Sequence, residues 1–198
     1  MADPELTIRH NFPRPDPDLV AAFADTPTGF VVDAMGRRGA LAPEIRRLCG
    51  SGSFVGTALT VWTVPRDNLA PYAALDAARP GDVLMVANGA ARDASVLGDL
   101  AIGMARNCGV IAVVTDGLVR DIAGIREVGI PVHAAGLSPN SPQKNGPGEI
   151  GQTISIGGVP VTAGDLVVGD EDGVVVVPLA RAAAVRDALA AVRKKEAE

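Results

Sequence analysis

Two short segments of the chain carry polar side chains whose types and spacing could bind a small organic acid. The first is Gly98-Asp99-Leu100-Ala101, and the second runs from Asp116 to Asp121 and includes Arg120. Each segment is predicted to follow a buried strand and precede a helix, where ligands bind in open α/β proteins. Amides at the start of a helix attract anions, and a guanidinium can bind a carboxylate through two hydrogen bonds. The pattern therefore predicts a site for a small carboxylate ligand.

The same segments could also hold a metal ion. Asp121 could bind a hard cation such as Mg²⁺ through one carboxylate, with water and substrate oxygens completing an octahedral shell. Gly98 would let an anion approach the amides closely, because it has no side chain.

Each of these residues also has a structural explanation. Asp99 could be only a helix cap, and Asp116-Gly117 only a turn. The neighbours Arg120 and Asp121 could form a surface ion pair worth at most about 1 kcal/mol. Spacing alone slightly favours these structural roles.

Hydrophobic patterning predicts the elements that position the two segments. Continuous apolar runs at Val83–Ala87 and Val110–Thr115 predict buried strands, and the alternating run Phe54–Val64 predicts a third. Helices are expected at Asp18–Ala24, capped by Asp18, and at Thr28–Met35, Asn68–Ala78, Asp99–Asn107, Ile122–Val128 and Leu179–Lys195. The order of these elements is typical of an α/β protein.

The second half of the chain has a different pattern. Short apolar segments separated by glycine-rich turns predict strands at Thr153–Ile156, Val159–Val161, Leu166–Val168 and Val174–Val177. We expect a β-rich layer there, followed by a C-terminal helix that packs on the domain or on a neighbouring subunit.

Length and composition restrict the class of protein. The chain has 198 residues, 47% of them hydrophobic, and a net charge of −5. We expect one α/β domain over 1–198, with a Pro-rich N-terminal arm at 1–28 and a C-terminal helix at 179–198. The acidic balance argues against a general nucleic-acid binder. No apolar segment has the length that a membrane crossing needs, and the N-terminus does not resemble a signal peptide, so a cytoplasmic protein is expected.

An ordered set of segments resembles the RraA-like family. The matching segments are Gly81–Leu84, Leu97–Ala101, Asp116–Asp121, Gly129–Val132, Ser138-Pro139, Gly157–Val161, Gly164-Asp165 and Asp170–Pro178. The family includes the class II 4-hydroxy-4-methyl-2-oxoglutarate aldolases, also known as 4-carboxy-4-hydroxy-2-oxoadipate aldolases. The resemblance implies a swivelling, phosphohistidine-domain-like β/β/α fold and a homotrimer or a dimer of trimers. It also implies a lyase that depends on Mg²⁺ or Mn²⁺, releases pyruvate from 4-hydroxy-2-oxo acids and decarboxylates oxaloacetate.

The resemblance also implies roles for individual residues. The amides of Gly98, Asp99, Leu100 and Ala101 would receive the pyruvyl carboxylate. Arg120 would contact the keto and carboxylate oxygens of the substrate.

Further roles concern the metal and proton transfer. Asp121 would bind the metal, and Lys144 matches a family lysine near the site. The base would be Asp99 acting through water, or a metal-bound hydroxide. Glu196 or Glu198 of a neighbouring subunit would act through metal-bound water, although a solvated charged tail is an equal explanation for both.

Other functions stay open from the sequence. A second branch of the family binds and inhibits the endoribonuclease RNase E without catalysis, and typically lacks the acidic residue that Asp121 supplies here. A sensor of small 2-oxo acids would use the same Arg120 pocket without turnover. His133 is predicted to pack in the interior, His10 to be exposed, and Asp170–Gly173 to form a charged β-turn.

Overall fold

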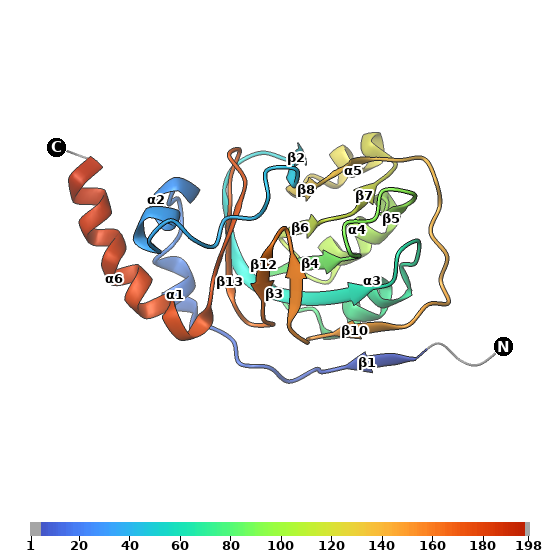
Figure 1. Cartoon of the computed structure of the whole chain (residues 1–198), viewed down its shortest axis with the longest axis horizontal. Coiled ribbons are helices and arrows are strands. Elements are labelled where there is room, and N and C mark those ends of the chain that lie inside the picture. The colour runs from blue at the N-terminus through green and yellow to red at the C-terminus, as the bar shows by residue number, and fades with distance from the viewer. Residues whose placement is uncertain (1–4, 197–198) are drawn as a thin grey trace.

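A large mixed sheet organises the part of the chain that the structure describes, residues 5–196, in a computed structural model (Figure 1). Its strands are β1 (Leu6–Ile8), β2 (Arg46–Cys49), β3 (Phe54–Thr63), β4 (Asp82–Ala87), β6 (Ala112–Thr115), β8 (Val132–Ala134), β10 (Gly148–Ile150), β13 (Leu166–Gly169) and β14 (Val174–Val177). Two smaller sheets consist of β5 (Ser95–Leu97), β7 (Leu118–Val119) and β9 (Gly136–Leu137), and of β11 (Ile154–Ile156) and β12 (Val159–Val161). The helices are α1 (Pro17–Ala21), α2 (Thr28–Ala34), α3 (Leu69–Ala73), α4 (Asp99–Asn107), α5 (Ile122–Val128) and α6 (Leu179–Glu196), with a 3₁₀ turn at Ala74–Ala77.

The centre of the large sheet is parallel, with β3, β4, β6 and β8 as successive neighbours. Every residue of β4 and β6 is buried. Continuous apolar strands of this kind are typical of a sheet covered on both faces. The predicted strands Val83–Ala87 and Val110–Thr115 are confirmed, although β6 begins two positions later than expected.

The second half of the chain is rich in strands, as predicted, but part of it joins the large sheet. Strand β13 pairs with the first half of β3 and β10 with the second half, and β14 pairs with β13. Since β3 is 10 residues long and binds β4 along its other edge, it has room for both short strands. Of the strands predicted after residue 150, β11 and β12 form a separate hairpin outside the large sheet.

A small parallel sheet sets the geometry of the two polar segments. Strand β7 lies between β5 and β9 and is parallel to both. The carboxyl ends of parallel strands meet at the same edge. Gly98 follows β5 and Arg120 follows β7, and the Arg120 amide donates a hydrogen bond to the Leu97 carbonyl at 3.0 Å. This sheet brings the two predicted segments together.

Helices α4 and α5 lie side by side over one face of the large sheet (Figure 1). Their buried residues, among them Ile102 and Ile125, share an apolar cluster with Leu84 and Val113 of the sheet. On the other side of the sheet, Ile154 and Ile156 of the hairpin pack in a second cluster with Met85. The sheet is therefore covered on both faces, as its composition predicts.

The C-terminal helix packs on its own chain. Ala182, Val185 and Leu189 are buried in a third apolar cluster, which includes residues of α2 and β14. The sequence left open whether this helix packs on the domain or on a neighbouring subunit. In the structure the domain itself covers the apolar side of α6.

Two predicted helices match the structure residue for residue, α4 at Asp99–Asn107 and α5 at Ile122–Val128. The prediction that Asp18 caps the first helix is wrong: α1 begins at Pro17 and its N-cap residue is Asp16. Proline suits the first turn, because its missing N–H would have no intrahelical partner there. The predicted helix at Asn68–Ala78 is divided into α3 and the 3₁₀ turn.

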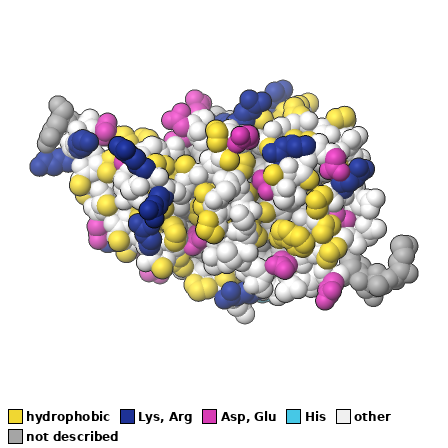
Figure 2. Space-filling model, viewed as in Figure 1, with side chains coloured by type: hydrophobic (Ala, Val, Ile, Leu, Met, Phe, Trp, Pro, Cys, Tyr) yellow, Lys and Arg dark blue, Asp and Glu magenta, His cyan; other side chains and the backbone are white. Residues whose placement is uncertain are grey.

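Acidic and basic side chains are interspersed on the face that Figure 2 shows. None of the helices within residues 5–196 combines the length and the apolar composition needed to cross a bilayer.

Candidate active site

A cleft of about 240 Å³ lies where the small sheet meets the start of α4 and α5. We call it the Arg120 cleft. Its lining residues are Asn68, Tyr72, Leu97, Gly98, Asp99, Leu100, Ala101, Arg120, Asp121, Ser141, Pro142 and Lys144. The cleft therefore brings together every predicted site residue of the described chain except Glu196.

Gly98 makes space in the cleft. Its φ of −135° is ordinary extended backbone, so a positive φ is not the reason for glycine here. A Cβ atom at this position would lie 2.7 Å from Oδ2 of Asp121 and 3.3 Å from Cγ of Arg120. Only glycine lets the start of α4 approach these two side chains so closely.

Arg120 and Asp121 are adjacent in sequence and paired in the cleft. Nε of Arg120 lies 3.1 Å from Oδ2 of Asp121, and the guanidinium also donates to the hydroxyl of Ser141. The two side chains are 36% and 45% exposed, so both charges are accessible to a ligand. The exposure also means that the pair contributes little to stability.

The backbone at Asp121 adopts a left-handed conformation, with φ 58° and ψ 42°. This conformation is unfavourable for a residue with a side chain and is enriched at functional sites. Asp121 is the N-cap residue of α5, yet within the described chain its carboxylate makes no capping hydrogen bond. Its position serves the contact with Arg120 and the cleft instead of the helix.

Asp99 lies at the junction of the cleft and a groove between α4 and α5. Its Oδ1 accepts a hydrogen bond from the Leu100 amide at 2.7 Å. A Cβ atom on Gly124 of α5 would overlap its carboxylate, so the two helices pack closely around it. The hydrogen bond from the Leu100 amide to Asp99 occupies one of the first-turn amides of α4 that were predicted to receive a substrate carboxylate.

Lys144 reaches the cleft from a loop far along the chain. Its ammonium lies 5.2 Å from the centre of the Tyr72 ring, a favourable cation–π arrangement. The buried carboxylate of Asp67 accepts hydrogen bonds from the amides of Asn145 and Gly146, both at 2.8 Å. The loop is thereby attached to the segment that begins α3.

Sequence reasoning missed Asn68, Tyr72, Ser141 and Pro142 as lining residues. Asn68 immediately precedes α3, and Tyr72 lies within it. Ser141 and Pro142 precede Lys144 in its loop. No local spacing relates these segments, since the pairing through Asp67 joins residues 78 and 79 positions apart. Only their order within the family resemblance could have indicated the loop.

The oxygen donors in the cleft fit a hard divalent cation held by few protein ligands. Asp121 presents an exposed carboxylate next to the space that a Gly98 side chain would fill, and Asp99 adds a second carboxylate to the same cleft. Residues 5–196 contain no group of three or more His, Cys, Asp or Glu side chains that could hold a metal ion. A cation at Asp121 would therefore complete its shell with water and substrate oxygens, as Mg²⁺ commonly does.

Glu196 does not lie near the Arg120 cleft within one chain. It lines a separate groove with Asp33, Gly36, Arg37, Val192 and Lys195. Figure 1 shows α6 at the end of the molecule opposite to α4. Glu198, the other candidate, is outside the described residues. A carboxylate from α6 could therefore reach this cleft only from another subunit.

Asp116 has a structural role beside the cleft. Its buried carboxylate accepts hydrogen bonds from the amides of Asn88 at 2.8 Å and Ala90 at 2.9 Å, and burial raises its pKa. Arg92 donates to the Asp116 carbonyl at 2.5 Å. Asp116 therefore joins the 88–90 loop to the bend between β6 and β7, and neither Arg92 nor Asp93 lines the cleft.

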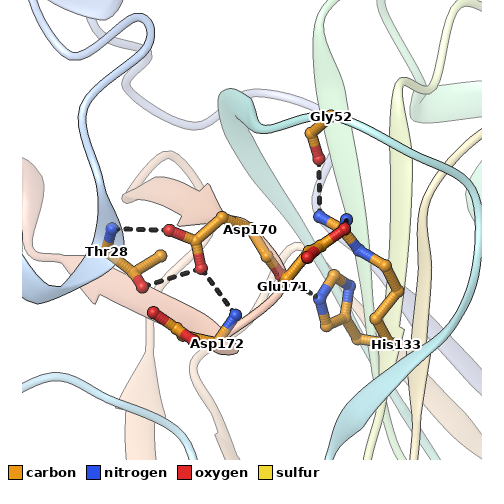
Figure 3. Close-up of polar contacts among 7 residues, drawn as sticks. Thr28, Gly52, His133, Asp170, Glu171 and Asp172 are labelled. Atoms are coloured by element: carbon orange, nitrogen blue, oxygen red, sulfur yellow. Dashed lines mark hydrogen bonds and ion pairs between the residues drawn. The ribbon is translucent and has the colours of Figure 1, made fainter.

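A second polar cluster surrounds His133 (Figure 3). We call Thr28, Arg47, Gly52, His133, Asp170, Glu171 and Asp172 the His133 cluster. The Asp170 carboxylate accepts hydrogen bonds from the amide and the hydroxyl of Thr28, both at 2.8 Å. Nε2 of His133 lies 3.0 Å from the Asp170 carbonyl oxygen, and burial lowers the pKa of the imidazole.

His133 packs as predicted. It is fully buried on β8, and its ring meets the Phe54 ring edge to face at 5.7 Å. His10 is exposed as expected. The predicted turn at Asp170–Gly173 is confirmed between β13 and β14, with the Asp170 amide donating to the Gly173 carbonyl at 3.0 Å.

Comparison with known proteins identifies relatives over most of the chain. The family model described as RraA-like, Aldolase/RraA, matches residues 28–176. A protein of Halalkalibacterium halodurans, provisionally named 4-hydroxy-4-methyl-2-oxoglutarate aldolase, is 37% identical over 161 residues, which cover 81% of this chain and 77% of the relative.

Solved structures of relatives have the same fold. An unusual member of the RNase ES inhibitor RraA protein family from Streptomyces coelicolor superposes with a TM-score of 0.81 at 30% identity, covering 92% of this chain and 96% of that chain. The RNA-processing inhibitor RraA from Thermus thermophilus gives 0.72 at 30% identity, covering 78% and 93%. The fold is therefore the α/β RraA-like fold.

Proposed function

Because this chain belongs to the RraA-like family, we propose that it is a divalent-metal-dependent lyase. Its substrates would be 4-hydroxy-2-oxo acids of the 4-hydroxy-4-methyl-2-oxoglutarate type, cleaved to pyruvate in a retro-aldol reaction, with oxaloacetate decarboxylation as a side activity. The observation that carries the proposal is the pairing of a partly exposed Arg120 with an exposed Asp121 in the cleft that Gly98 also lines.

Both reactions need the same stabilisation. Breaking the C3–C4 bond of either substrate leaves the enolate of pyruvate, whose negative charge develops on the former keto oxygen. A fixed positive charge aimed at that oxygen lowers the barrier. Arg120 would supply this charge, and the free first-turn amides of α4 would hold the pyruvyl carboxylate.

Asp121 would hold Mg²⁺ or Mn²⁺, and Asp99 offers a second oxygen donor nearby. When bound, the cation would supply Lewis-acid polarisation of the keto and carboxylate oxygens of the substrate. Asp99, acting through a water molecule, would take the proton of the 4-hydroxyl group, and Lys144 would add a positive charge at the Tyr72 side of the cleft.

The active assembly would be a homotrimer or a dimer of trimers. Within one chain Glu196 lies in a different groove from the Arg120 cleft. A neighbouring subunit could bring its own Glu196 to the mouth of the cleft, where the carboxylate would act through water.

A second candidate function is that of a non-catalytic regulator. Two solved relatives at 30% identity are named as RNase ES or RNA-processing inhibitors. In that role this chain would bind RNase E and inhibit it. RNase E would then bind the surface of the protein outside the cleft, so substitutions in the cleft would leave RNase E inhibition unchanged.

The two candidates are separated by measuring pyruvate release from purified protein in a coupled assay. Oxaloacetate and 4-hydroxy-4-methyl-2-oxoglutarate are each tested with Mg²⁺ and with a chelator, and uncatalysed oxaloacetate decay is subtracted. Metal-dependent release that is lost in Asp121→Ala but kept in Asp76→Ala, an exposed acid outside the cleft, supports the lyase. Release that stays at background for both substrates contradicts it, and inhibition of RNase E would then support the regulator.

A further inference from the structure

Two neighbours of different charge hold the guanidinium of Arg120 in the cleft. Its Nε atom lies 3.1 Å from Oδ2 of Asp121, and its Nη1 atom donates a hydrogen bond to the Ser141 hydroxyl. All three residues line the cleft. Because a guanidinium presents five N–H groups in one fixed plane, contacts at two of its nitrogen atoms orient the whole group. Donors on the remaining nitrogen stay available to a ligand.

The loop that carries Ser141 is anchored on the small sheet of the cleft. The Asn140 carbonyl accepts hydrogen bonds from the amide and the hydroxyl of the buried Ser95 on β5, at 3.0 and 2.7 Å. The Ser138 amide donates to the carbonyl of Val119, the last residue of β7, at 3.0 Å. The backbone that leads into Ser141 is therefore fixed to two strands of the sheet that also positions the arginine.

A hydroxyl group and a carboxylate have different effects on a guanidinium. Asp121 offsets the charge of Arg120 and is also the proposed metal ligand. A cation on the same carboxylate would weaken the attraction between Asp121 and Arg120. Ser141 accepts its hydrogen bond without carrying a charge, so it leaves the guanidinium fully positive. The contact with Ser141 can therefore hold Arg120 whether or not Asp121 binds a cation.

We propose that Ser141 is a positioning residue that directs the Arg120 guanidinium at the former keto oxygen of the substrate. The proposal rests on the lyase function proposed above. Donors stabilise a developing charge best when they are already oriented and need no reorganisation during the reaction. The Arg120 side chain is 36% exposed, so without the hydroxyl group its guanidinium would turn toward solvent more freely. Ser141 acts through Arg120 and does not itself contact the reacting atoms.

The kinetic test compares Ser141→Ala, which removes the hydroxyl group, with Ser141→Thr, which keeps it. With Mg²⁺ present, Ser141→Ala should lower kcat for oxaloacetate and for 4-hydroxy-4-methyl-2-oxoglutarate by about 10-fold, because a hydrogen bond to a charged group is lost. KM should change by less than about threefold, since the oxygen gains its charge only in the transition state. Ser141→Thr should restore kcat. Ser155→Ala, an exposed serine of β11 outside the cleft, is the matched control and should change neither constant.

A binding measurement distinguishes positioning from a structural role. Oxalate carries negative charge on planar oxygen atoms placed like those of the pyruvate enolate, whereas the keto oxygen of pyruvate is neutral. In calorimetric titrations with Mg²⁺, Ser141→Ala should weaken oxalate binding by about 10-fold and pyruvate binding by less than about threefold, as expected for an analogue of the charged state. The melting temperature should not change, because Ser141 is exposed.

Three results would each overturn the positioning role and leave the lyase intact. They are an unchanged kcat in Ser141→Ala, an equal loss of kcat in Ser141→Ala and Ser141→Thr, and an equal weakening of oxalate and pyruvate binding. Absence of turnover by the unsubstituted protein would overturn the lyase function and this proposal together.

Discussion

The Arg120 cleft and the His133 cluster are both polar, yet they differ in where their hydrogen bonds and charges are directed. In the His133 cluster, Asp170 uses its carboxylate on Thr28 and its carbonyl on His133. In the cleft, Arg120 and Asp121 form an ion pair that remains more than a third exposed. The cluster joins parts of the fold to one another, whereas the cleft keeps charges accessible.

This difference separates stability from function. Thr28 and Asp170 are 142 positions apart, so their contact closes a long loop and attaches α2 to the β13–β14 turn. Arg120 and Asp121 are neighbours, so their contact holds nothing distant together. The left-handed backbone of Asp121 even carries a cost, which argues for a role outside folding.

The largest effect should come from Arg120→Ala. We expect pyruvate release to fall by roughly 100- to 1,000-fold, because the variant loses the charge that we propose to stabilise the enolate. The melting temperature should change little, since the ion pair is exposed. Arg126→Ala, an exposed residue of α5 outside the cleft, is the control and should keep full activity. Near-normal turnover of the Arg120 variant would contradict the proposal that the Arg120 cleft is the active site.

Asp121→Asn should weaken metal binding without affecting the fold. Asparagine tolerates a left-handed backbone but has no charge. We expect affinity for Mg²⁺, measured by calorimetric titration, to fall by at least the roughly 10- to 100-fold typical of outer-shell changes around a metal. Asp76→Asn should bind the ion as the unsubstituted protein does. Equal affinity in the Asp121 and Asp76 variants would place the metal elsewhere.

Asp170→Ala should show the opposite profile. The amide and hydroxyl of Thr28 would lose their acceptor, which should lower the free energy of unfolding by about 1–2 kcal/mol. Activity per folded molecule should stay unchanged. Denaturant unfolding of this variant and of Asp172→Ala, an exposed residue of the same turn, checks the expectation. Loss of turnover without loss of stability would show that the His133 cluster also acts in function.

The smallest effect concerns His133 and pH. Burial lowers the pKa of His133 in the folded protein, so the folded state binds fewer protons than the unfolded state. Its contribution to stability should therefore be complete above the ordinary histidine pKa and should be lost as the pH falls below it. His133→Phe should reduce this acid sensitivity in thermal unfolding between about pH 7 and 5 and leave turnover unchanged, whereas His10→Phe should alter neither.

Local signals in the sequence predicted much of the framework around the cleft. Apolar runs predicted β4 and β6, and side-chain patterning predicted α4 and α5 to the residue. These features depend on neighbours within a few positions, which the sequence displays directly. The same signals placed both polar segments after buried strands and predicted a shared site, but they did not predict β5 and β7, the strands that Gly98 and Arg120 follow.

The sequence by itself determined which residues could do chemistry, since Arg120, Asp121 and Asp99 offer their charges in any fold. Only the tertiary structure decided which of them share a cleft and what completes it. Strands β5, β7 and β9 have 3, 2 and 2 residues, too short for a periodic pattern. Asn68 and Lys144 line the same cleft, and the buried Asp67 carboxylate next to Asn68 accepts hydrogen bonds from amides 78 and 79 positions away. Hydrogen bonds over such separations form only when the chain has folded, so they leave no local mark on the sequence.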